Sequence, residues 1–265
     1  MSTPKLDGAQ ALIQTLNELG VEYIFGYSGG AALPIFDALE TVSGNIKFVL
    51  TRHEQGACHM ADGYARATGK PAVVLVTSGP GAGNTITGIM TAQMDSVPMI
   101  IITGQQVTWM LGKDAFQEAD IFGITMPVVK HNFLVRETNS LPRIAKEAYH
   151  IATTGRPGPV LIDVPKDISQ SDFTGDLNPD LDLPGYNPDS AFEIAQDGIS
   201  RAAEIISTAK KPVILAGHGV MISRADEELM ELATTLKCPV TTTLLGKGVF
   251  PETHELSLGM LGMHG

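Results

Sequence analysis

The sequence predicts an α/β protein built around a parallel β-sheet with helices on both faces. Short, almost wholly apolar runs rich in β-branched residues alternate with longer segments whose apolar residues recur every three or four positions. Strands that are apolar on both sides are typical of parallel sheets covered by helices on each face. The chain has 28 glycines and 16 prolines, which suits the many tight turns between strands and helices in this class.

The first part of the chain contains the longer series of these elements. The predicted strands are residues 21–26, 46–50, 72–77, 99–103, 130–135 and 160–164. The predicted helices are residues 12–19, 33–39, 57–68, a segment ending at Asp95, and 142–152. Gly69 stands where a helix C-terminal glycine is expected. We therefore expect residues 1–166 to form one α/β domain.

The second part of the chain begins after a change of composition. Residues 167–190 are dominated by Asp, Asn, Pro, Gly and Ser without periodicity, which predicts a linker over the surface. Helices at 191–208 and 225–236 then alternate with strands at 213–216 and 240–243, around a Gly-His-Gly turn. Since doubly wound sheets usually have more strands than this, we expect residues 191–265 to be an incomplete α/β domain.

Composition and charge exclude several classes of partner. The formal charge of −11 and the isoelectric point near 5.0 argue against binding to nucleic acids or to an anionic membrane surface. No apolar stretch is long enough to span a bilayer, so we expect a soluble, cytoplasmic protein. The two cysteines, Cys58 and Cys238, have no metal-ligand spacing and are expected to be buried small residues without a disulfide.

Glu54 is the leading candidate for chemistry. It follows the predicted strand 46–50 and precedes a helical segment, among small residues that let other groups approach. A carboxyl group partly removed from water at such a junction can hold or transfer a proton near neutral pH. The alternative is that Glu54 only interacts with the dipole at the helix N-terminus, as acidic residues of a first turn commonly do. Position alone leaves these two interpretations about equally supported.

Three other segments each allow a functional and a structural interpretation. The glycine-rich turn 78–84 resembles a phosphate cradle but lacks the lysine of a P-loop, so its glycines can also serve close strand–helix packing. Residues 114–118 follow a strand end, where parallel-sheet enzymes bind ligands, although a solvated turn explains their charges. Arg156 can pair with a phosphate or stabilise its own turn.

Taken together, the motifs resemble the thiamine-diphosphate (ThDP) decarboxylase family and, within it, the catalytic subunits of acetolactate (acetohydroxyacid) synthases. The matching stretches run in order along almost the whole chain: FGYSGGAALPIFDAL, RHEQGACHMADGYARATGKP, VTSGPGAGN, DSVPMIIITGQ, GKDAFQEAD, KHNFLV, GRPGPVLIDVPKDI and ELSLGMLGMHG. The HEQGA element indicates the wider family, and its combination with DAFQE, GRPGPV and LGMHG is specific to the narrower one. The resemblance implies a ThDP pyrimidine-binding domain followed by part of an FAD-binding middle domain.

The resemblance also implies roles for individual residues. Glu54 and Gln117 would be catalytic, Glu54 by hydrogen-bonding N1′ of the ThDP aminopyrimidine. Gln117 and Ser96 would lie near the same cofactor. The implied substrate-channel residues are Gly30, Ala31, Phe116 and Lys130. The implied FAD-binding residues are Arg156, Gly217, Gly219, Thr243, Leu244, Leu261, Gly262, Met263 and His264. The chain departs from the family pattern at Ser28, where proline is common, at His218 within a usual triple glycine, and at Trp109 and Lys113 near DAFQE.

The activity implied is decarboxylation of pyruvate and ligation to a second 2-oxo acid, a step of branched-chain amino acid biosynthesis. The family's diphosphate-binding domain, which holds Mg²⁺, is absent from this chain, so we assign no metal ligand here and expect this piece alone to be inactive. The implied partners are further copies of the chain, with the active site between subunits, and a small regulatory subunit. Alternatives are another ThDP-dependent carboligase, decarboxylase or acetyltransferase, or a non-catalytic truncated homologue.

Overall fold

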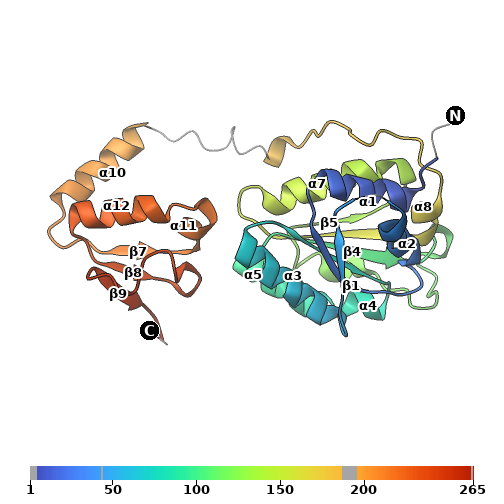
Figure 1. Cartoon of the computed structure of the whole chain (residues 1–265), viewed down its shortest axis with the longest axis horizontal. Coiled ribbons are helices and arrows are strands. Elements are labelled where there is room, and N and C mark those ends of the chain that lie inside the picture. Colours follow the sequence, from blue (N-terminus) through green and yellow to red (C-terminus); the bar gives the residue numbers. More distant parts are fainter. Residues whose placement is uncertain (1–4, 43, 187–195, 264) are drawn as a thin grey trace. The chain divides into compact units, whose positions relative to one another are not determined.

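The computed structural model describes residues 5–42, 44–186, 196–263 and 265. The chain divides into two compact units, residues 1–188 and residues 189–265. Each unit is an α/β arrangement of its own, and the two are described separately below (Figure 1).

The first unit is built on a sheet of six strands in the order β2-β1-β3-β4-β6-β5. All neighbouring strands are parallel, which confirms the predicted fold class. The strands are β1 (Tyr23–Tyr27), β2 (Lys47–Leu50), β3 (Ala72–Val76), β4 (Met99–Gln105), β5 (His131–Leu134) and β6 (Pro159–Pro165). The three central strands β3, β4 and β6 are buried along their entire length, as their continuous apolar sequences predict.

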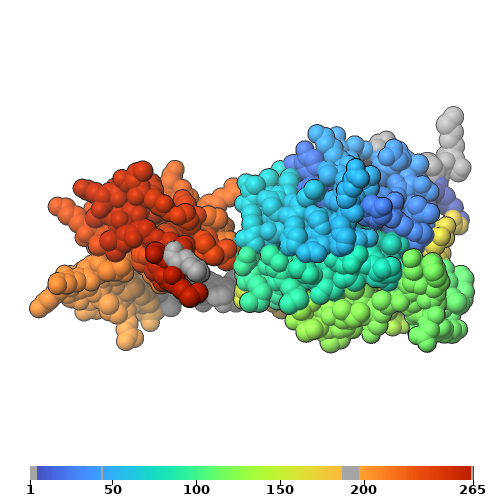
Figure 2. All heavy atoms as spheres, turned by 90° about the horizontal axis from the view of Figure 1, so that it is seen from below, coloured from blue at the N-terminus to red at the C-terminus, as the bar shows by residue number. Residues whose placement is uncertain are grey.

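Helices cover both faces of this sheet (Figure 1). The helices of one face are α1 (Gly8–Glu18), α2 (Leu33–Thr41), α7 (Leu141–Thr153) and α8 (Lys166–Gln170). The helices of the other face are α3 (Glu54–Thr68), α4 (Pro80–Gly83), α5 (Ile86–Asp95) and α6 (Ile121–Thr125). Two short 3₁₀ turns, η1 (Thr108–Met110) and η2 (Thr138–Ser140), lie in connections. In Figure 2 the light-blue and teal segments, which include α3 and α5, form the middle of the visible face of the first unit, beside dark-blue and green segments.

Alternate residues of each central strand enter two separate hydrophobic cores. In β3, Val73 and Leu75 belong to the core beneath α1, α2 and α7, while Val74 and Val76 belong to the core beneath α3 and α5. This alternation follows from the two-residue period of a strand, and it explains why both sets of positions must be apolar. The second of these cores fixes α3 and α5 against the sheet, which in turn fixes the loops at their ends.

The strand order creates a switch point between β1 and β3. From β1 the chain crosses outward to β2, and it then returns to add β3 on the other side of β1. The loops after β1 and after β3 therefore leave the sheet in opposite directions, and in such sheets ligands bind in the crevice beyond the carboxyl ends of the strands. The loop after β2, which leads to Glu54, emerges at the same edge.

The described part of the predicted linker lies against the first unit. It includes α8, in which Ile168 is buried, and a 3₁₀ turn, η3 (Pro184–Tyr186). Phe173 is buried as well, and Tyr186 packs against the core beneath α7. Most other side chains of this stretch are exposed, as its polar composition suggests. The remaining residues of the predicted linker, 187–190, lie outside the described part of the chain.

The second unit contains a three-stranded parallel sheet in the order β7-β8-β9. Its elements are α10 (Gln196–Thr208), β7 (Ile214–Ala216), α11 (His218–Ser223), α12 (Asp226–Leu236), β8 (Val240–Thr242), η4 (Leu244–Gly246) and β9 (Ser257–Met260). Two of these differ from the sequence-based prediction. The predicted Gly-His-Gly turn continues into helix α11, with Gly217 as its N-cap, and β9 was not predicted at all.

Two further findings concern composition. Cys58 and Cys238 are free and buried, as predicted. Across the described ranges, no helix combines the length and the apolar character that crossing a bilayer would require.

Candidate active site

Glu54 is the first residue of α3, at the junction that the sequence predicts. The junction is rigid, because the hydroxyl and the backbone N–H of Thr51 both donate to the carbonyl of Gly26 in the neighbouring strand, at 3.1 and 2.9 Å. His53 caps the helix, since its Nδ1 accepts from the backbone N–H of Gln55 at 3.1 Å. At the other end, Gly69 adopts a left-handed conformation with φ +70°, which confirms its predicted role as the C-terminal glycine.

Glu54 is half-buried, and its carboxylate faces the glycine-rich loop after β3. Its Oε2 accepts a hydrogen bond from Asn84 Nδ2 at 3.0 Å. Its Oε1 lies beside Gly81, where an added Cβ would stand 3.3 Å away. One turn along the helix, burial and then the negative charge of Glu54 raise the pKa of the Cys58 thiol to about 12, so this thiol stays neutral. The Cys58 thiol is therefore a poor nucleophile, which leaves the Glu54 carboxylate as the candidate group of this junction.

Glycines bring the loop after β1 against the loop after β3. A Cβ on Gly29 would lie 2.5 Å from Cβ of Thr77, and one on Gly81 would lie 2.8 Å from Thr77 Cγ2. The Thr77 hydroxyl accepts a hydrogen bond from the backbone N–H of Ala31 at 3.3 Å. Gly30, which lies between Gly29 and Ala31 in the loop after β1, is exposed, and no atom lies within 4 Å of the position that a Cβ would take. The structure therefore brings Gly30, Ala31 and Glu54 to the same edge of the sheet.

The segment after β4 reaches the same loop from the other side. Gly79 has φ +53°, and its missing Cβ makes room for the backbone carbonyl of Gln117, which would be only 2.4 Å from that atom. Gln117 itself has φ +56°, a conformation that is uncommon without glycine. Its neighbour Phe116 is 83% exposed.

Ser96, Arg156 and Lys130 gather at the opposite edge of the sheet. Arg156 Nε donates to Ser96 Oγ at 2.7 Å, and its Nη2 donates to the carbonyl of Met94 at 3.2 Å, so Arg156 caps the C-terminus of α5. Lys130 Nζ donates to the carbonyls of Ile151 and Thr154 at the end of α7, and burial lowers its pKa. These residues precede β4, β5 and β6, so within one chain they do not join Glu54 and Gln117.

In the second unit, the loops after the three strands meet at one edge. Gly217 begins the loop after β7, Thr243 and Leu244 follow β8, and residues 261–263 follow β9. The backbone N–H of Thr243 donates to the carbonyl of Ala216 at 3.0 Å, which joins the first two loops. This edge contains Gly217, Gly219, Thr243, Leu244, Leu261, Gly262 and Met263. His264 lies outside the described residues.

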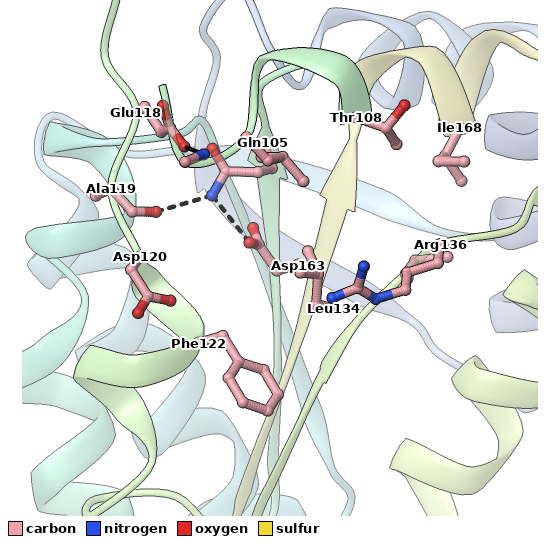
Figure 3. Close-up of a pocket in the computed structure, with 13 residues that line it drawn as sticks. Gln105, Thr108, Glu118, Ala119, Asp120, Phe122, Leu134, Arg136, Asp163 and Ile168 are labelled. Atoms are coloured by element: carbon pink, nitrogen blue, oxygen red, sulfur yellow. Dashed lines mark hydrogen bonds between the residues drawn. The ribbon is translucent and has the colours of Figure 1, made fainter. Parts of the chain in front are cut away.

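A buried carboxyl group that the sequence-based interpretation missed lies further along the carboxyl edge of the first sheet. Asp163, in the middle of β6, is only 1% exposed, and its carboxylate accepts from Thr103 Oγ1 at 2.6 Å and from Gln105 Nε2 at 3.0 Å. It borders a cavity of about 650 Å³ whose wall also includes Asp120 and Arg136 (Figure 3). Burial raises the pKa of Asp163 to about 7. The signal in the sequence was a single aspartate inside an otherwise apolar strand.

Asn84, the partner of Glu54, was also missed as a functional residue. It belongs to the glycine-rich turn that the sequence singled out, but nothing in its spacing of 30 positions from Glu54 indicates the contact. The contact depends on the return of β3 beside β1, which places the loop after β3 over the start of α3.

Comparison with known proteins connects this arrangement to a family. Residues 6–124 match the family model of the thiamine pyrophosphate (ThDP) enzyme N-terminal TPP-binding domain, and residues 199–265 match that of the thiamine pyrophosphate enzyme central domain. The acetolactate synthase large subunit of Buchnera aphidicola subsp. Acyrthosiphon pisum is 50% identical over 262 residues, which are 98% of this chain and 45% of that protein.

Two further relatives give the same result. The acetolactate synthase of Mycobacterium bovis is 52% identical over 261 residues, covering 98% of this chain and 42% of that protein. The probable acetolactate synthase large subunit of Methanocaldococcus jannaschii is 51% identical over 263 residues, covering 98% and 44% respectively. The chain thus spans less than half the length of these relatives. On the two matching family models, and on the α/β fold they accompany, the chain belongs to the thiamine pyrophosphate enzyme family.

Proposed function

We propose that this chain forms the N-terminal and central part of the catalytic large subunit of an acetolactate synthase. The proposed reaction is ThDP-dependent decarboxylation of pyruvate followed by ligation to a second 2-oxo acid, in branched-chain amino acid biosynthesis in the cytoplasm. The observation that carries the proposal is the carboxylate of the half-buried Glu54 at the switch point, held by Asn84 beside the glycines of the loop after β3. The three relatives named above, all called acetolactate synthases, support the choice of reaction.

The residues at the switch point fit the pyrimidine end of ThDP. Gly30 leaves open space at the surface, and Gly81 allows close approach to the Glu54 oxygens. A carboxylate that is held by one neutral amide, with no cation paired to it in the described residues, can share a proton with a heterocyclic nitrogen. Glu54 would therefore hold N1′ of the aminopyrimidine, with Gln117 nearby. When bound, the cofactor supplies the nucleophilic carbon and the electron sink that loss of carbon dioxide requires.

The groups around Glu54 orient its carboxylate. Since Asn84 donates to Oε2, the other oxygen stays available on the side of Gly81. Ala57 and Cys58, in the next turn of α3, are buried in the neighbouring core and so anchor the start of the helix against the sheet. Glu54 is thus oriented by its helix and by Asn84 before any ligand arrives.

A site formed between two copies of the chain would account for the separation of the proposed residues. Gly30, Ala31 and Phe116 lie at the carboxyl edge of the first sheet, whereas Lys130 and Ser96 lie at its amino edge. The seven-residue strand β4 spans this separation, which amounts to roughly 20 Å at about 3.3 Å per residue. In a homo-oligomer, the amino edge of one chain can contribute Lys130 to the site that contains Glu54 of another. A small regulatory subunit is a further proposed partner.

Two other cofactors belong to the proposal. FAD would bind at the carboxyl edge of the second sheet, where Gly217, Gly219, Thr243 and Leu244 meet residues 261–263, with Arg156 and His264 as further contacts. Mg²⁺ would be held by residues beyond this chain, together with the diphosphate of ThDP. We assign the domains accordingly: residues 1–166 bind the pyrimidine, residues 167–190 connect, and residues 191–265 begin the FAD-binding domain.

The test uses the full-length polypeptide that contains this chain. Supplied with ThDP, Mg²⁺ and pyruvate, it is expected to release carbon dioxide and to form acetolactate. Absence of carbon dioxide release would contradict the proposal. Release of carbon dioxide with acetaldehyde as the product, from a preparation without flavin, would replace acetolactate synthase by another ThDP-dependent decarboxylase.

A further inference from the structure

The loop that contains Gln117 is held in a conformation that its own residues do not favour. Within residues 112–119, both Asp114 and Gln117 have positive φ, +53° and +56°. Side chains other than glycine rarely adopt this conformation, and it costs on the order of 1 kcal/mol or more per residue. Such a loop keeps its shape only if contacts from outside determine it.

Within the loop, the Glu118 carboxylate accepts from the backbone N–H groups of Gly112 and Ala115. Two neighbouring glutamines at the end of β4 supply the contacts from outside. Gln106 Nε2 donates to the carbonyl of Phe116 at 2.7 Å, and Gln105 Nε2 donates to the carbonyl of Ala119 at 2.9 Å. The two amides therefore hold the backbone on either side of Gln117. Since the carbonyl of Gln117 also packs against Gly79, the loop after β3 and the Gln105 amide together set where Gln117 lies.

The buried Asp163 is one of three groups that select which way the Gln105 amide faces. A glutamine amide presents two donors on nitrogen and an acceptor on oxygen, and either end can occupy the same space. Here Asp163 Oδ2 accepts from Nε2 at 3.0 Å, so the nitrogen is fixed on the side of Asp163 and of Ala119 (Figure 3). The oxygen then accepts from the backbone N–H of Gln106 at 2.9 Å. Without an acceptor at position 163, the amide loses one of the three contacts that select this orientation, and the only one made by a buried side chain.

The cavity beside Asp163 does not by itself indicate a ligand. Of the acidic side chains on its wall, Asp163 is bonded to Thr103 and Gln105, Glu118 accepts from the backbone of Ala115, and Asp120 caps α6 through the backbone of Gly123. No set of three potential metal ligands occurs within the described ranges. The acidic groups around the cavity are therefore engaged in fixing the chain, which favours a positioning role for Asp163 over direct contact with a ligand.

We propose that Asp163 is a positioning residue for Gln117: it orients the Gln105 amide, which holds the carbonyl of Ala119 and so fixes the 112–119 loop beside the Glu54 site. Asp163 contacts Gln105, Gln105 contacts the carbonyl of Ala119, and Asp163 therefore acts on the loop only through Gln105. The consequence for catalysis rests on the proposed function, because that function assigns Gln117 a place near ThDP. The effect of Asp163 on the order of the 112–119 loop does not depend on the proposed function.

The test compares hydrogen–deuterium exchange of the 112–119 segment in the full-length polypeptide and three variants. Asp163→Val removes the acceptor of the Gln105 side chain. It is expected to speed exchange of the backbone N–H groups of residues 112–119 about tenfold, because a loop that loses a restraint opens more often. Asp163→Asn keeps an oxygen that can face Gln105 and is expected to exchange like the wild type. Thr103→Val is the matched control, because it removes a bond of 2.6 Å from the same carboxylate but on the oxygen that faces away from Gln105.

Steady-state kinetics with pyruvate supply the second readout. A misplaced Gln117 is expected to lower kcat about tenfold in Asp163→Val with KM for pyruvate within about twofold, and Asp163→Asn is expected to restore kcat. If Asp163→Val does not fold, Gln105→Met interrupts the same link from the other side and carries the same expectations. The exchange comparison remains informative even if pyruvate is not turned over, so a failure of the proposed function is distinguishable from a failure of this inference.

Two results would overturn the proposal. One is exchange of the 112–119 segment that is no faster in Asp163→Val, or in Gln105→Met, than in Thr103→Val. The other is equal acceleration in Asp163→Asn and Asp163→Val, which would mean that the acceptor oxygen at position 163 does not orient Gln105.

Discussion

The side-chain amide of Asn84 donates a hydrogen bond of 3.0 Å to the Glu54 carboxylate, across 30 positions of sequence. Asn84 ends the glycine-rich loop after β3, and Glu54 begins the helix after β2, so the bond joins two loops of the carboxyl edge. It holds one oxygen of Glu54 and leaves the other beside Gly81. The role of this bond, like the roles of the residues tested by substitution, is measured in the full-length polypeptide.

Replacing Asn84 by Ala should reduce kcat/KM for pyruvate about tenfold, because the Glu54 carboxylate loses the hydrogen bond that orients it. Asn84 is exposed, so the thermal unfolding midpoint should change little. Steady-state kinetics and a thermal melt measure the two effects. Asn139→Ala is the matched control, since Asn139 is an exposed asparagine that donates to Thr174 far along the chain. An unchanged kcat/KM in Asn84→Ala would show that the bond is dispensable.

Gly81→Ala should weaken ThDP binding. The added Cβ would lie 2.8 Å from Thr77 Cγ2 and 3.3 Å from Glu54 Oε1, so either the loop or the carboxylate must move. We expect a rise of about tenfold in the Kd for ThDP, measured by titration calorimetry. Gly63→Ala is the control, because this glycine of α3 has no atom within 4 Å of the Cβ position. Equal ThDP affinity in the two variants would argue against close approach of a ligand at Gly81.

Asp163 should make stability depend on pH. Its pKa is raised from 3.8 to about 7 by burial, so the folded protein binds this proton more tightly than the unfolded chain does. The stabilisation is complete below about pH 4 and is lost as the pH rises through about 7, with a magnitude on the order of 4 kcal/mol. Between pH 5 and pH 8, the thermal midpoint of the wild type should therefore fall relative to the thermal midpoint of Asp163→Asn. A difference that is constant over this range would contradict the assignment.

Gly219→Leu should lower the flavin content without affecting ThDP binding. Gly219 is exposed and has open space at its Cβ position, so the larger side chain fits the folded protein but occupies the edge where FAD is proposed to bind. Flavin content is read from the visible absorbance of the purified protein, and ThDP binding from calorimetry. Flavin retained at the level of the wild type would remove the loop after β7 from the proposed FAD site.

The sequence predicted the first sheet well because its strands are apolar on both faces. The six predicted strands correspond to β1–β6, and the position of Glu54 at a strand–helix junction was predicted from the change of period after Leu50. These features depend on local patterns, which a sequence displays directly. The same reason explains why Gly69 was recognised as a helix C-terminal residue.

The same local patterns did not predict contacts between residues that are far apart in the sequence. Ser96 and Arg156 bond to each other 60 positions apart, and Lys130 caps α7, so these residues lie at the amino edge although the resemblance grouped Ser96 with Glu54. The partner of Glu54 and the network of Asp163 likewise depend on strand order. In the second unit, β9 was missed because Ser257–Met260 is short and contains a glycine.

The most direct measurement of the central claim is the turnover of pyruvate by Glu54→Gln in the full-length, ThDP-loaded polypeptide. The substitution keeps the size of the side chain and removes its proton-binding oxygen, so kcat should fall by two or more orders of magnitude, roughly 3 kcal/mol or more of barrier, while the thermal midpoint stays close to that of the wild type. Turnover within a few-fold of the wild type would mean that Glu54 does not act on the cofactor, and the proposed role of the switch-point carboxylate would be wrong.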